Sequence, residues 1–228
     1  MLPLPVSLIV PCRNEARNLE LLLPRLAGVA DELIVVDGHS TDHTSCLAER
    51  FGARFVLDSG LGKGDGVRTG LAAASREICV FIDADLSHDP AEIPALVRPI
   101  LEGRADLVLG SRMRGGGDEF IATLPELVRL FGNMTLTWLV NLRTGARLSD
   151  SQNGFRAART ALLRSLRLIS NRHTIELEMI MRALRRRARV IEVATHEHPR
   201  RFGASSLSVS RQALLFLWCY LRECIRPL

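Results

Sequence analysis

Short apolar runs alternate with helical patterns along the first half of the chain. Runs rich in β-branched residues predict buried strands at 6–10, 33–36, 54–57, 78–82 and 107–109. Between them, apolar residues recur at helical spacing, and glycines such as Gly28 and Gly52 follow the predicted helices. Strands that alternate with helices are typical of a parallel sheet wrapped by helices. The pattern therefore predicts an α/β fold.

The second half of the chain has a different pattern. It predicts a flexible glycine-rich loop at 114–117, helices at 124–142 and 174–187, a strand at 189–193 and a loop at 196–203. A last helix begins near Ser208 and contains nine consecutive apolar residues, 213–221. The sequence contains no fixed-period repeat and no segment of disordered composition, so we expect a single domain.

Two carboxylates, Asp83 and Asp85, end the apolar run at 78–82 abruptly. Burying an unpaired carboxylate costs several kcal/mol, so these acids must emerge from the sheet or meet a cation. Ligands bind at the carboxyl ends of strands in open parallel sheets, and carboxylate oxygens suit Mg²⁺ or Mn²⁺. The pair therefore predicts a metal and diphosphate site. The alternative role, a helix cap, fits Asp89, which directly precedes Pro90.

Polar residues also follow the first two predicted strands. Arg13, Asn14 and Glu15 come after the first strand, and Asp37 ends the second. Because the carboxyl ends of parallel strands meet at one edge of a sheet, these side chains converge there with the acid pair. Together they outline a site for the base and ribose of a nucleotide.

The glycine-rich segment 59–66 matches neither common phosphate-binding loop. A Walker loop needs Ser or Thr after Gly-Lys, but Gly64 follows Lys63 here. Asp65 stands where the dinucleotide-binding fingerprint has its third glycine. ATPase and NAD-dependent functions therefore lose their best support. Two roles stay open for this segment: a flexible loop, or a loop close to the nucleotide or the sugar.

Composition narrows the class of partner. The net charge of +5 and a pI near 9.4 come from arginine, and they indicate an anionic partner: phosphates, nucleic acid or an acidic membrane surface. Aromatic residues are only 5% of the chain and no recognition motif occurs, which disfavours a nucleic-acid-binding protein. Five cysteines without a framework, no signal peptide and no membrane-spanning run predict a cytoplasmic protein.

Six motifs resemble, in the same order, the family 2 glycosyltransferases with the GT-A fold. The resemblance is closest to the polyprenyl-phosphate branch, which includes dolichol-phosphate mannose synthases. The motifs are VSLIVPCRNE (6–15), IVVDGHSTDHT (34–44), GKG (62–64), FIDADLSHDP (81–90), GSR (110–112) and NGFR (153–156). The resemblance extends from Val6 to about Gly203. It implies a mostly parallel central sheet flanked by helices, with a helical C-terminal segment.

The resemblance also implies a division of the single domain, residues 1–228. Residues 1–112 would bind the nucleotide sugar, 113–206 would form the acceptor side, and 207–228 would be an amphipathic helix. The implied donor-binding residues are Pro11, Arg13, Glu15, Asp37, Lys63, Asp83 and Ala84. Asp83 and Asp85 would form the Asp-x-Asp pair that holds the nucleotide and a divalent ion, Mg²⁺ or Mn²⁺.

Further residues are implied on the acceptor side. Arg112 would face phosphate charge, Asp150 would lie near the acceptor, and Arg201 with Ser205 would occupy the phosphate-binding loop. With Asp85, the residues Arg112 and Asp150 are the implied catalytic groups. The chain departs from the family pattern at Ser87, where the lipid-phosphate branch has a glutamine, and at 203–206, where the usual lysine is missing.

The implied reaction is an inverting, metal-dependent transfer of a hexose. The donor would be of the GDP-mannose or UDP-glucose type, and the acceptor a polyprenyl phosphate. A soluble hydroxyl acceptor is the alternative, with Asp150 as the general base. A sheet of this type would also serve a transferase that acts on the phosphate of a sugar nucleotide. We interpret His196 and His198 as surface loop residues.

Two roles for the C-terminal helix stay open. It either covers the sheet or lies on a lipid surface, at the inner face of a membrane. The sequence does not predict the oligomeric state.

Overall fold

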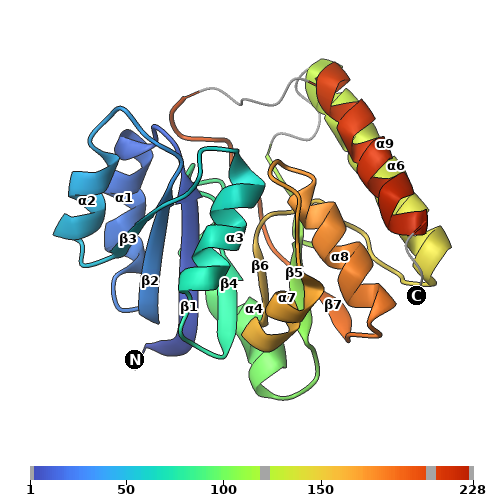
Figure 1. Cartoon of the computed structure of the whole chain (residues 1–228), viewed down its shortest axis with the longest axis horizontal. Coiled ribbons are helices and arrows are strands. Elements are labelled where there is room, and N and C mark those ends of the chain that lie inside the picture. The colour runs from blue at the N-terminus through green and yellow to red at the C-terminus, as the bar shows by residue number, and fades with distance from the viewer. Residues whose placement is uncertain (1–2, 119–123, 204–208, 226–228) are drawn as a thin grey trace.

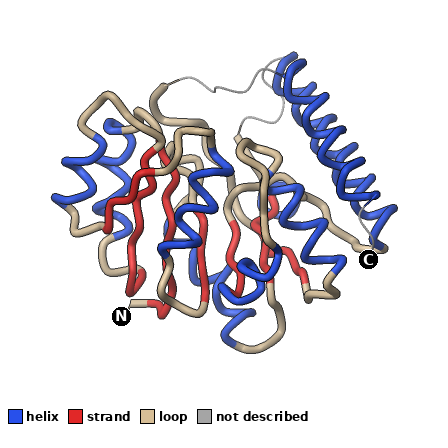
Figure 2. Tube along the Cα trace, viewed as in Figure 1, coloured by secondary structure: helices blue, strands red, loops and turns tan. Residues whose placement is uncertain are grey.

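The computed structural model describes residues 3–118, 124–203 and 209–225. A seven-stranded sheet with the order β3-β2-β1-β4-β6-β5-β7 forms its centre (Figures 1 and 2). The strands are β1 (Leu4–Cys12), β2 (Ala30–Asp37), β3 (Arg54–Leu57), β4 (Ile78–Phe81), β5 (Leu107–Ser111), β6 (Arg156–Arg159) and β7 (Val190–Ala194). Neighbouring strands are parallel except at β6, which runs antiparallel to β4 and β5. The predicted α/β fold with a mostly parallel sheet is confirmed.

Helices cover both faces of this sheet (Figure 1). They are α1 (Ala16–Leu26), α2 (Thr44–Arg50), α3 (Lys63–Ala73), the 3₁₀ turn η1 (Pro90–Glu92), α4 (Ile93–Leu101), α5 (Arg112–Gly115), α6 (Leu124–Thr144), α7 (Thr160–Leu166), α8 (Ile175–Arg185) and α9 (Val209–Ile225). Strand β1 is buried on both sides because its side chains alternate between two cores. Leu8 and Val10 lie in the core with α1 and α4, and Ile9 lies in the core with α3 and α8.

Five of the six predicted strands coincide closely with β1 to β5, and the sixth with β7. Strand β6 was missed, together with helix α7. The four residues of β6 are Arg-Ala-Ala-Arg, which carry no apolar run, yet this strand joins β4 to β5 in the middle of the sheet. The loop predicted at 114–117 is wrong at its start, because α5 begins at Arg112 and extends to Gly115.

The glycine-rich segment is not a loop throughout, because α3 begins at Lys63. Its glycines allow the helix to approach its neighbours closely. A Cβ atom on Gly64 would lie 2.4 Å from the Ser170 carbonyl oxygen, and one on Gly70 would lie 2.4 Å from a methyl group of Ile9. These contacts are shorter than van der Waals distances, so α3 needs glycine at both positions to lie against β1 and the loop before α8.

Helices α6 and α9 lie side by side at the edge of the molecule (Figure 1). The C-terminal helix, α9, contacts α6 and α8. The hydroxyl group of Tyr220 in α9 donates a hydrogen bond to the Leu139 carbonyl of α6 at 3.2 Å. Within the described residues, no helix combines the length and the apolar character that are needed to cross a bilayer.

Candidate active site

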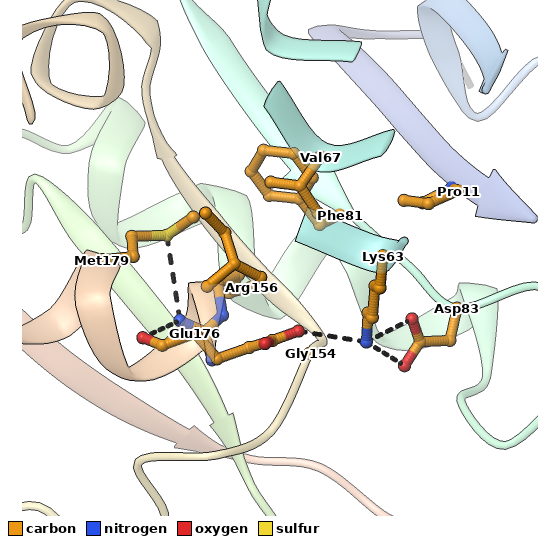
Figure 3. Close-up of a pocket in the computed structure, with 10 residues that line it drawn as sticks. Pro11, Lys63, Val67, Phe81, Asp83, Gly154, Arg156, Glu176 and Met179 are labelled. Atoms are coloured by element: carbon orange, nitrogen blue, oxygen red, sulfur yellow. Dashed lines mark hydrogen bonds and ion pairs between the residues drawn. The ribbon is translucent and has the colours of Figure 1, made fainter. Parts of the chain in front are cut away.

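The acid pair lies where the sequence predicts it, directly after β4. Lys63, the first residue of α3, contacts Asp83 with its ammonium nitrogen 2.7 Å from Oδ1 and 3.0 Å from Oδ2. The same nitrogen lies 3.1 Å from Oε1 of Glu176, near the start of α8 (Figure 3). Lys63 is the only lysine in a chain with 30 basic residues. Through its two ion pairs, the Lys63 ammonium group links the start of α3 to the segment after β4 and to α8.

At this contact, the attraction between opposite charges affects the pKa values of Asp83 and Lys63 more than burial does. Burial opposes ionisation of Asp83, but the Lys63 charge outweighs it and lowers the pKa of Asp83 to about 2. Burial also opposes the charge on Lys63, and Asp83 with Glu176 more than compensates, so the pKa of Lys63 is raised. Asp83 and Lys63 therefore form a charged pair at neutral pH, and Glu176 lies in contact with the same ammonium group. Gly154 lies beneath them, where a Cβ atom would be 2.8 Å from the lysine nitrogen.

Asp85 has a different set of partners. Its Oδ1 accepts from the Ser87 backbone N–H at 3.1 Å and from the Ser87 hydroxyl at 2.6 Å. Its Oδ2 lies 3.0 Å from the guanidinium of Arg200, which also contacts Glu15 at 2.6 Å. Arg200 thus connects the end of β1 with the end of β4. Ser87, which replaces the family's glutamine, serves here to orient Asp85.

The loop after β7 places Arg200, not Arg201, at the acids. The Arg201 backbone N–H donates to the Asp85 carbonyl at 3.1 Å, while the Arg201 side chain is exposed. Arg201 is the residue predicted for the phosphate-binding loop, and its neighbour Arg200 is the one whose side chain reaches the acids. Two adjacent arginines in a loop give no signal for which one folds back onto the acids. Ser205, the other residue predicted for this loop, lies outside the described residues.

Other predicted donor-binding residues are spread along the same edge of the sheet. Asp37 ends β2, is buried, and accepts from the Ser40 backbone at 3.0 Å and from the Ser40 hydroxyl. Arg13 is exposed beside Gly38. Ala84 is buried in the core, so only its backbone is available to a ligand. Asp89 caps η1 as predicted, accepting from the Ala91 backbone at 2.9 Å.

Arg112 and Asp150 form a second ion pair, between β5 and the segment before β6. The Arg112 guanidinium donates to both oxygens of Asp150, at 2.6 and 3.0 Å, and to Glu197 at 3.0 Å. Asn133 of α6 adds a hydrogen bond to Asp150 at 2.9 Å. Asp150 is fully buried. Burial alone would raise its pKa, but the Arg112 charge outweighs this and lowers the pKa. Asp150 therefore holds Arg112 and is a weak base.

A pocket lies between the acid pair and α8 (Figure 3). It is lined by Pro11, Lys63, Val67, Phe81, Asp83, Gly154, Arg156, Ile175, Glu176 and Met179. Arg156 is 1% exposed and donates to the carbonyl oxygens of Asn153 and Glu176, at 3.1 and 3.3 Å. None of the ion pairs formed within the described residues includes Arg156. Burial lowers its pKa.

Two buried polar atoms around this pocket have no hydrogen-bond partner among the described residues. They are Oε2 of Glu176 and Nδ2 of Asn153. A buried polar group without a partner is costly, so these atoms suit a polar ligand such as a sugar. Neither Arg156 nor Glu176 is among the site residues predicted from the sequence. Glu176 stands in the first turn of α8, where the helix dipole alone would favour an acid, and its contact with Lys63 is not visible in the sequence.

The two loop histidines form a cluster with Asp118. His196 Nε2 lies 2.8 Å from one carboxylate oxygen, and His198 Nδ1 lies 3.1 Å from the other. The three ligand atoms lie within 4.8 Å of one another, a spacing that suits a metal ion. The histidines are partly exposed, as expected for surface loop residues. The hydrogen bond to Asp118 raises the pKa of His196.

The order of elements and the acid pair at the end of β4 agree with one family of sugar transferases. The sequence profile of glycosyl transferase family 2 matches residues 7–167. The chain belongs to glycosyltransferase family 2. It is therefore a glycosyltransferase with a GT-A fold, and its donor is a nucleotide sugar.

Relatives of this glycosyltransferase include proteins with different acceptors. An uncharacterized glycosyltransferase of Mycobacterium tuberculosis is 35% identical over 93% of this chain and 96% of its own length. The dolichol-phosphate mannosyltransferase of Pyrococcus furiosus is 28% identical over 97% of this chain and 63% of its own. Glucosyl-3-phosphoglycerate synthase of M. tuberculosis, solved with Mn²⁺, UDP-glucose and phosphoglyceric acid, gives a TM-score of 0.75 at 25% identity over 97% of this chain and 80% of that one.

Proposed function

We propose that this glycosyltransferase moves a hexose from a nucleotide-diphosphate sugar to a polyprenyl phosphate, with inversion and with the help of a divalent ion. The observation that carries the proposal is a set of three fixed cations: Lys63 and Arg200 at the acid pair, and Arg112 at Asp150. Both the donor and the acceptor would bring phosphate charge that such cations attract. The P. furiosus relative is named for a dolichol-phosphate acceptor.

The acids fit a divalent ion by their chemistry. Carboxylate oxygens are the ligands that Mg²⁺ and Mn²⁺ prefer, and the side chains of Asp83 and Asp85 are 29% and 15% exposed, so an ion can reach them. Both acids would be ligands, and Lys63 and Arg200 are the cations that compete with the ion for them. The bound ion would stabilise the charge that develops on the departing diphosphate.

The donor sugar would bind at the pocket beside Lys63. The cavity has a volume of about 10 Å³, room for about one water molecule, so it must widen to admit a hexose. Glu176 has one oxygen on Lys63 and a second, buried oxygen without a partner among the described residues, which could accept from a sugar hydroxyl once the pocket opens. Lys63 is placed to attract the diphosphate, and Arg156 adds a positive charge to the lining of the pocket.

A phosphate acceptor agrees with the state of Asp150. In the proposed step, an acceptor phosphate oxygen attacks the anomeric carbon as the bond to the donor diphosphate breaks. A phosphate is already an anion near neutral pH, so it needs positive groups more than a base. Arg112 can supply such a group, since its side chain is 19% exposed and is held in place by Asp150. A hydroxyl acceptor needs a free carboxylate base, and both oxygens of Asp150 are engaged.

A soluble acceptor is the second candidate. It is favoured by the structural similarity to glucosyl-3-phosphoglycerate synthase, which was solved with phosphoglyceric acid. That acceptor also brings anionic charge, so the arginines would suit it. Location at the inner face of a membrane stays a prediction.

The test measures product formation with purified protein, Mn²⁺, and GDP-mannose or UDP-glucose. Undecaprenyl phosphate and 3-phosphoglycerate are offered in separate reactions. We expect sugar to appear in the lipid-extractable product, and EDTA to abolish it. Transfer to the soluble acceptor alone would contradict the proposal. Asp85→Asn should abolish transfer and leave the fold intact. Asp89→Asn alters the cap of η1 and the exposed ion pair with Arg25, away from the acid pair, and should keep transfer.

Donor binding can be measured separately by calorimetry, with Lys63→Met as the variant that removes the ammonium group from the pocket. We expect the correct nucleotide sugar with Mn²⁺ to bind the unchanged protein and to bind Lys63→Met much more weakly, because the diphosphate loses a cation. If Lys63→Met binds the donor as tightly as the unchanged protein does, this pocket is not the donor site.

A further inference from the structure

Helices α6 and α9 each expose a row of large apolar side chains. On α6, Phe131, Trp138 and Leu142 are 66, 61 and 68% exposed. On α9, Leu214, Trp218 and Ile225 are 72, 62 and 84% exposed. Within each helix the spacing of these residues places them on one face. We call these six residues the α6/α9 surface.

The two rows lie on neighbouring helices. Helices α6 and α9 lie side by side (Figure 1). The Tyr220 hydroxyl of α9 donates to the Leu139 carbonyl of α6. Their opposite sides, which carry Val140 and Cys219, are buried in the core, so the exposed rows point away from it. Large apolar side chains that gather on neighbouring helices rarely face water without a binding function.

Positive side chains dominate the charges around the α6/α9 surface. Among the side chains described on these helices, the fully exposed charged ones are Arg129 and Arg143, and Arg147 is exposed just beyond α6. Glu126, in the first turn of α6, is only partly exposed, and Glu223 is buried against Arg182 and Arg185. A second copy of this surface would bring the same three arginines and, among the described side chains, only one partly exposed carboxylate to pair with them. Anionic lipid headgroups would complement them.

The surface is also next to the site. Asn133, on the core-facing side of α6, donates to Asp150, the residue that holds Arg112. The same helix thus carries an apolar outer face and an inner contact to the acceptor side. A protein that rests on a bilayer through α6 and α9 would hold Arg112 close to that bilayer.

We propose that the α6/α9 surface docks this protein on an anionic lipid bilayer. Trp138 and Trp218 would lie at the boundary between headgroups and acyl chains, where an indole ring finds both an apolar and a polar environment. The two helices would lie in the plane of the membrane surface, since no described helix is long and apolar enough to cross a bilayer. The inference concerns the lipid surface and does not depend on which acceptor the enzyme uses.

The chain offers a direct reporter for this surface. Its two tryptophans are Trp138 and Trp218, so all tryptophan emission comes from the α6/α9 surface. The full-length protein is titrated with phosphatidylcholine vesicles, with or without phosphatidylglycerol, in the absence of nucleotide sugar and polyprenyl phosphate. We expect phosphatidylglycerol vesicles to shift the emission to the blue and to protect both rings from iodide. Neutral vesicles should bind at least about tenfold more weakly.

A double variant tests the location while keeping both reporters. Leu142→Gln with Leu214→Gln should weaken binding to the anionic vesicles more than about tenfold, because two apolar side chains no longer enter the bilayer. Leu57→Gln with Leu101→Gln is the matched control, since these leucines are 54 and 53% exposed elsewhere on the protein. It should bind like the unchanged chain.

Three results would overturn the proposal. The first is an unchanged emission spectrum with both kinds of vesicle. The second is equal loss of binding in the control variant. The third is a blue shift that grows with protein concentration without lipid, accompanied by a doubled mass in light scattering, because a second copy would then cover the surface.

Discussion

Lys63 provides the sharpest test of how the site is held together. Its ammonium group is the shared partner of Asp83 and Glu176, and the Lys63 side chain is 20% exposed. In Lys63→Met, two carboxylates remain side by side without their cation. Removing one partner of a buried ion pair costs about 3 to 5 kcal/mol, and we expect the lower end here because the site is partly open to water. The difference between the ordinary pKa of Asp83, 3.8, and its value of about 2 corresponds to about 2 kcal/mol, the same order.

The assay is thermal and denaturant unfolding of Lys63→Met against the unchanged protein. A loss of about 3 kcal/mol corresponds to a Tm lower by about 6 to 12 °C for a chain of this size. A second variant, Lys63→Met with Glu176→Gln, removes one of the two stranded charges and should recover about half of the loss. Because this double variant still lacks the lysine, it should not regain donor binding. Stability and binding are thereby separated.

The pH dependence gives the sign of the effect. In the unchanged protein the lowered pKa of Asp83 contributes stability that is present above about pH 4 and is lost as the pH falls toward 2. In Lys63→Met, burial without a cation raises the pKa of Asp83. The stability of that variant should therefore increase as the pH falls from 7 to 5, opposite to the usual loss in acid. A Tm within 2 °C of the unchanged protein, or a loss that does not shrink in mild acid, would refute this account of the site.

Four further variants test other contacts. Asp150→Asn should lower kcat/KM by about 10- to 100-fold, since the guanidinium of Arg112 loses its charged anchor; if the acidic limb of the pH–rate profile also disappears, Asp150 acts as a base instead. Arg200→Gln should tighten Mn²⁺ binding about tenfold in calorimetry without nucleotide, because the second acid of the pair loses its competing cation; unchanged affinity would contradict this. Gly70→Ala should destabilise the protein by about 1 to 3 kcal/mol through overpacking against β1. Gly132→Ala, in open space on α6, should stabilise the protein by about 0.5 to 1 kcal/mol. If both glycine variants changed the stability by the same amount, close packing around Gly70 would not account for its effect.

Local sequence patterns were sufficient to predict the strand ends that form the site. The run 78–82 is apolar and ends in acids, so both its burial and the exposure of Asp83 and Asp85 follow from the sequence alone. Strand β6 could not be predicted in this way. Its four residues have the composition of a loop, and it forms a strand only because β4 and β5 each have a free edge for it. Tertiary pairing decides this element, not its own propensity.

Contacts between distant segments account for the residues that the sequence analysis missed. Hydrogen bonds from His198 to the Ser87 carbonyl and from Arg201 to the Asp85 carbonyl align the loop after β7 along the acid pair. This alignment directs the Arg200 side chain to Asp85. Adjacent arginines are equivalent in the sequence, and only the backbone path distinguishes them.

Each of the three acids of the candidate site is paired with one cation, and this pairing connects the ion pairs to substrate binding. Lys63, Arg200 and Arg112 neutralise Asp83, Asp85 and Asp150, each from a distant segment of the chain. These pairs keep buried charge satisfied before any substrate arrives. A nucleotide diphosphate carries the same charge as the acids, so it competes with them for Lys63 and Arg200. Any carboxylate that it releases becomes free to bind a divalent ion. Donor and metal should therefore raise each other's affinity by one common factor, and weakening the contact of Arg200 with the acids should reduce that factor.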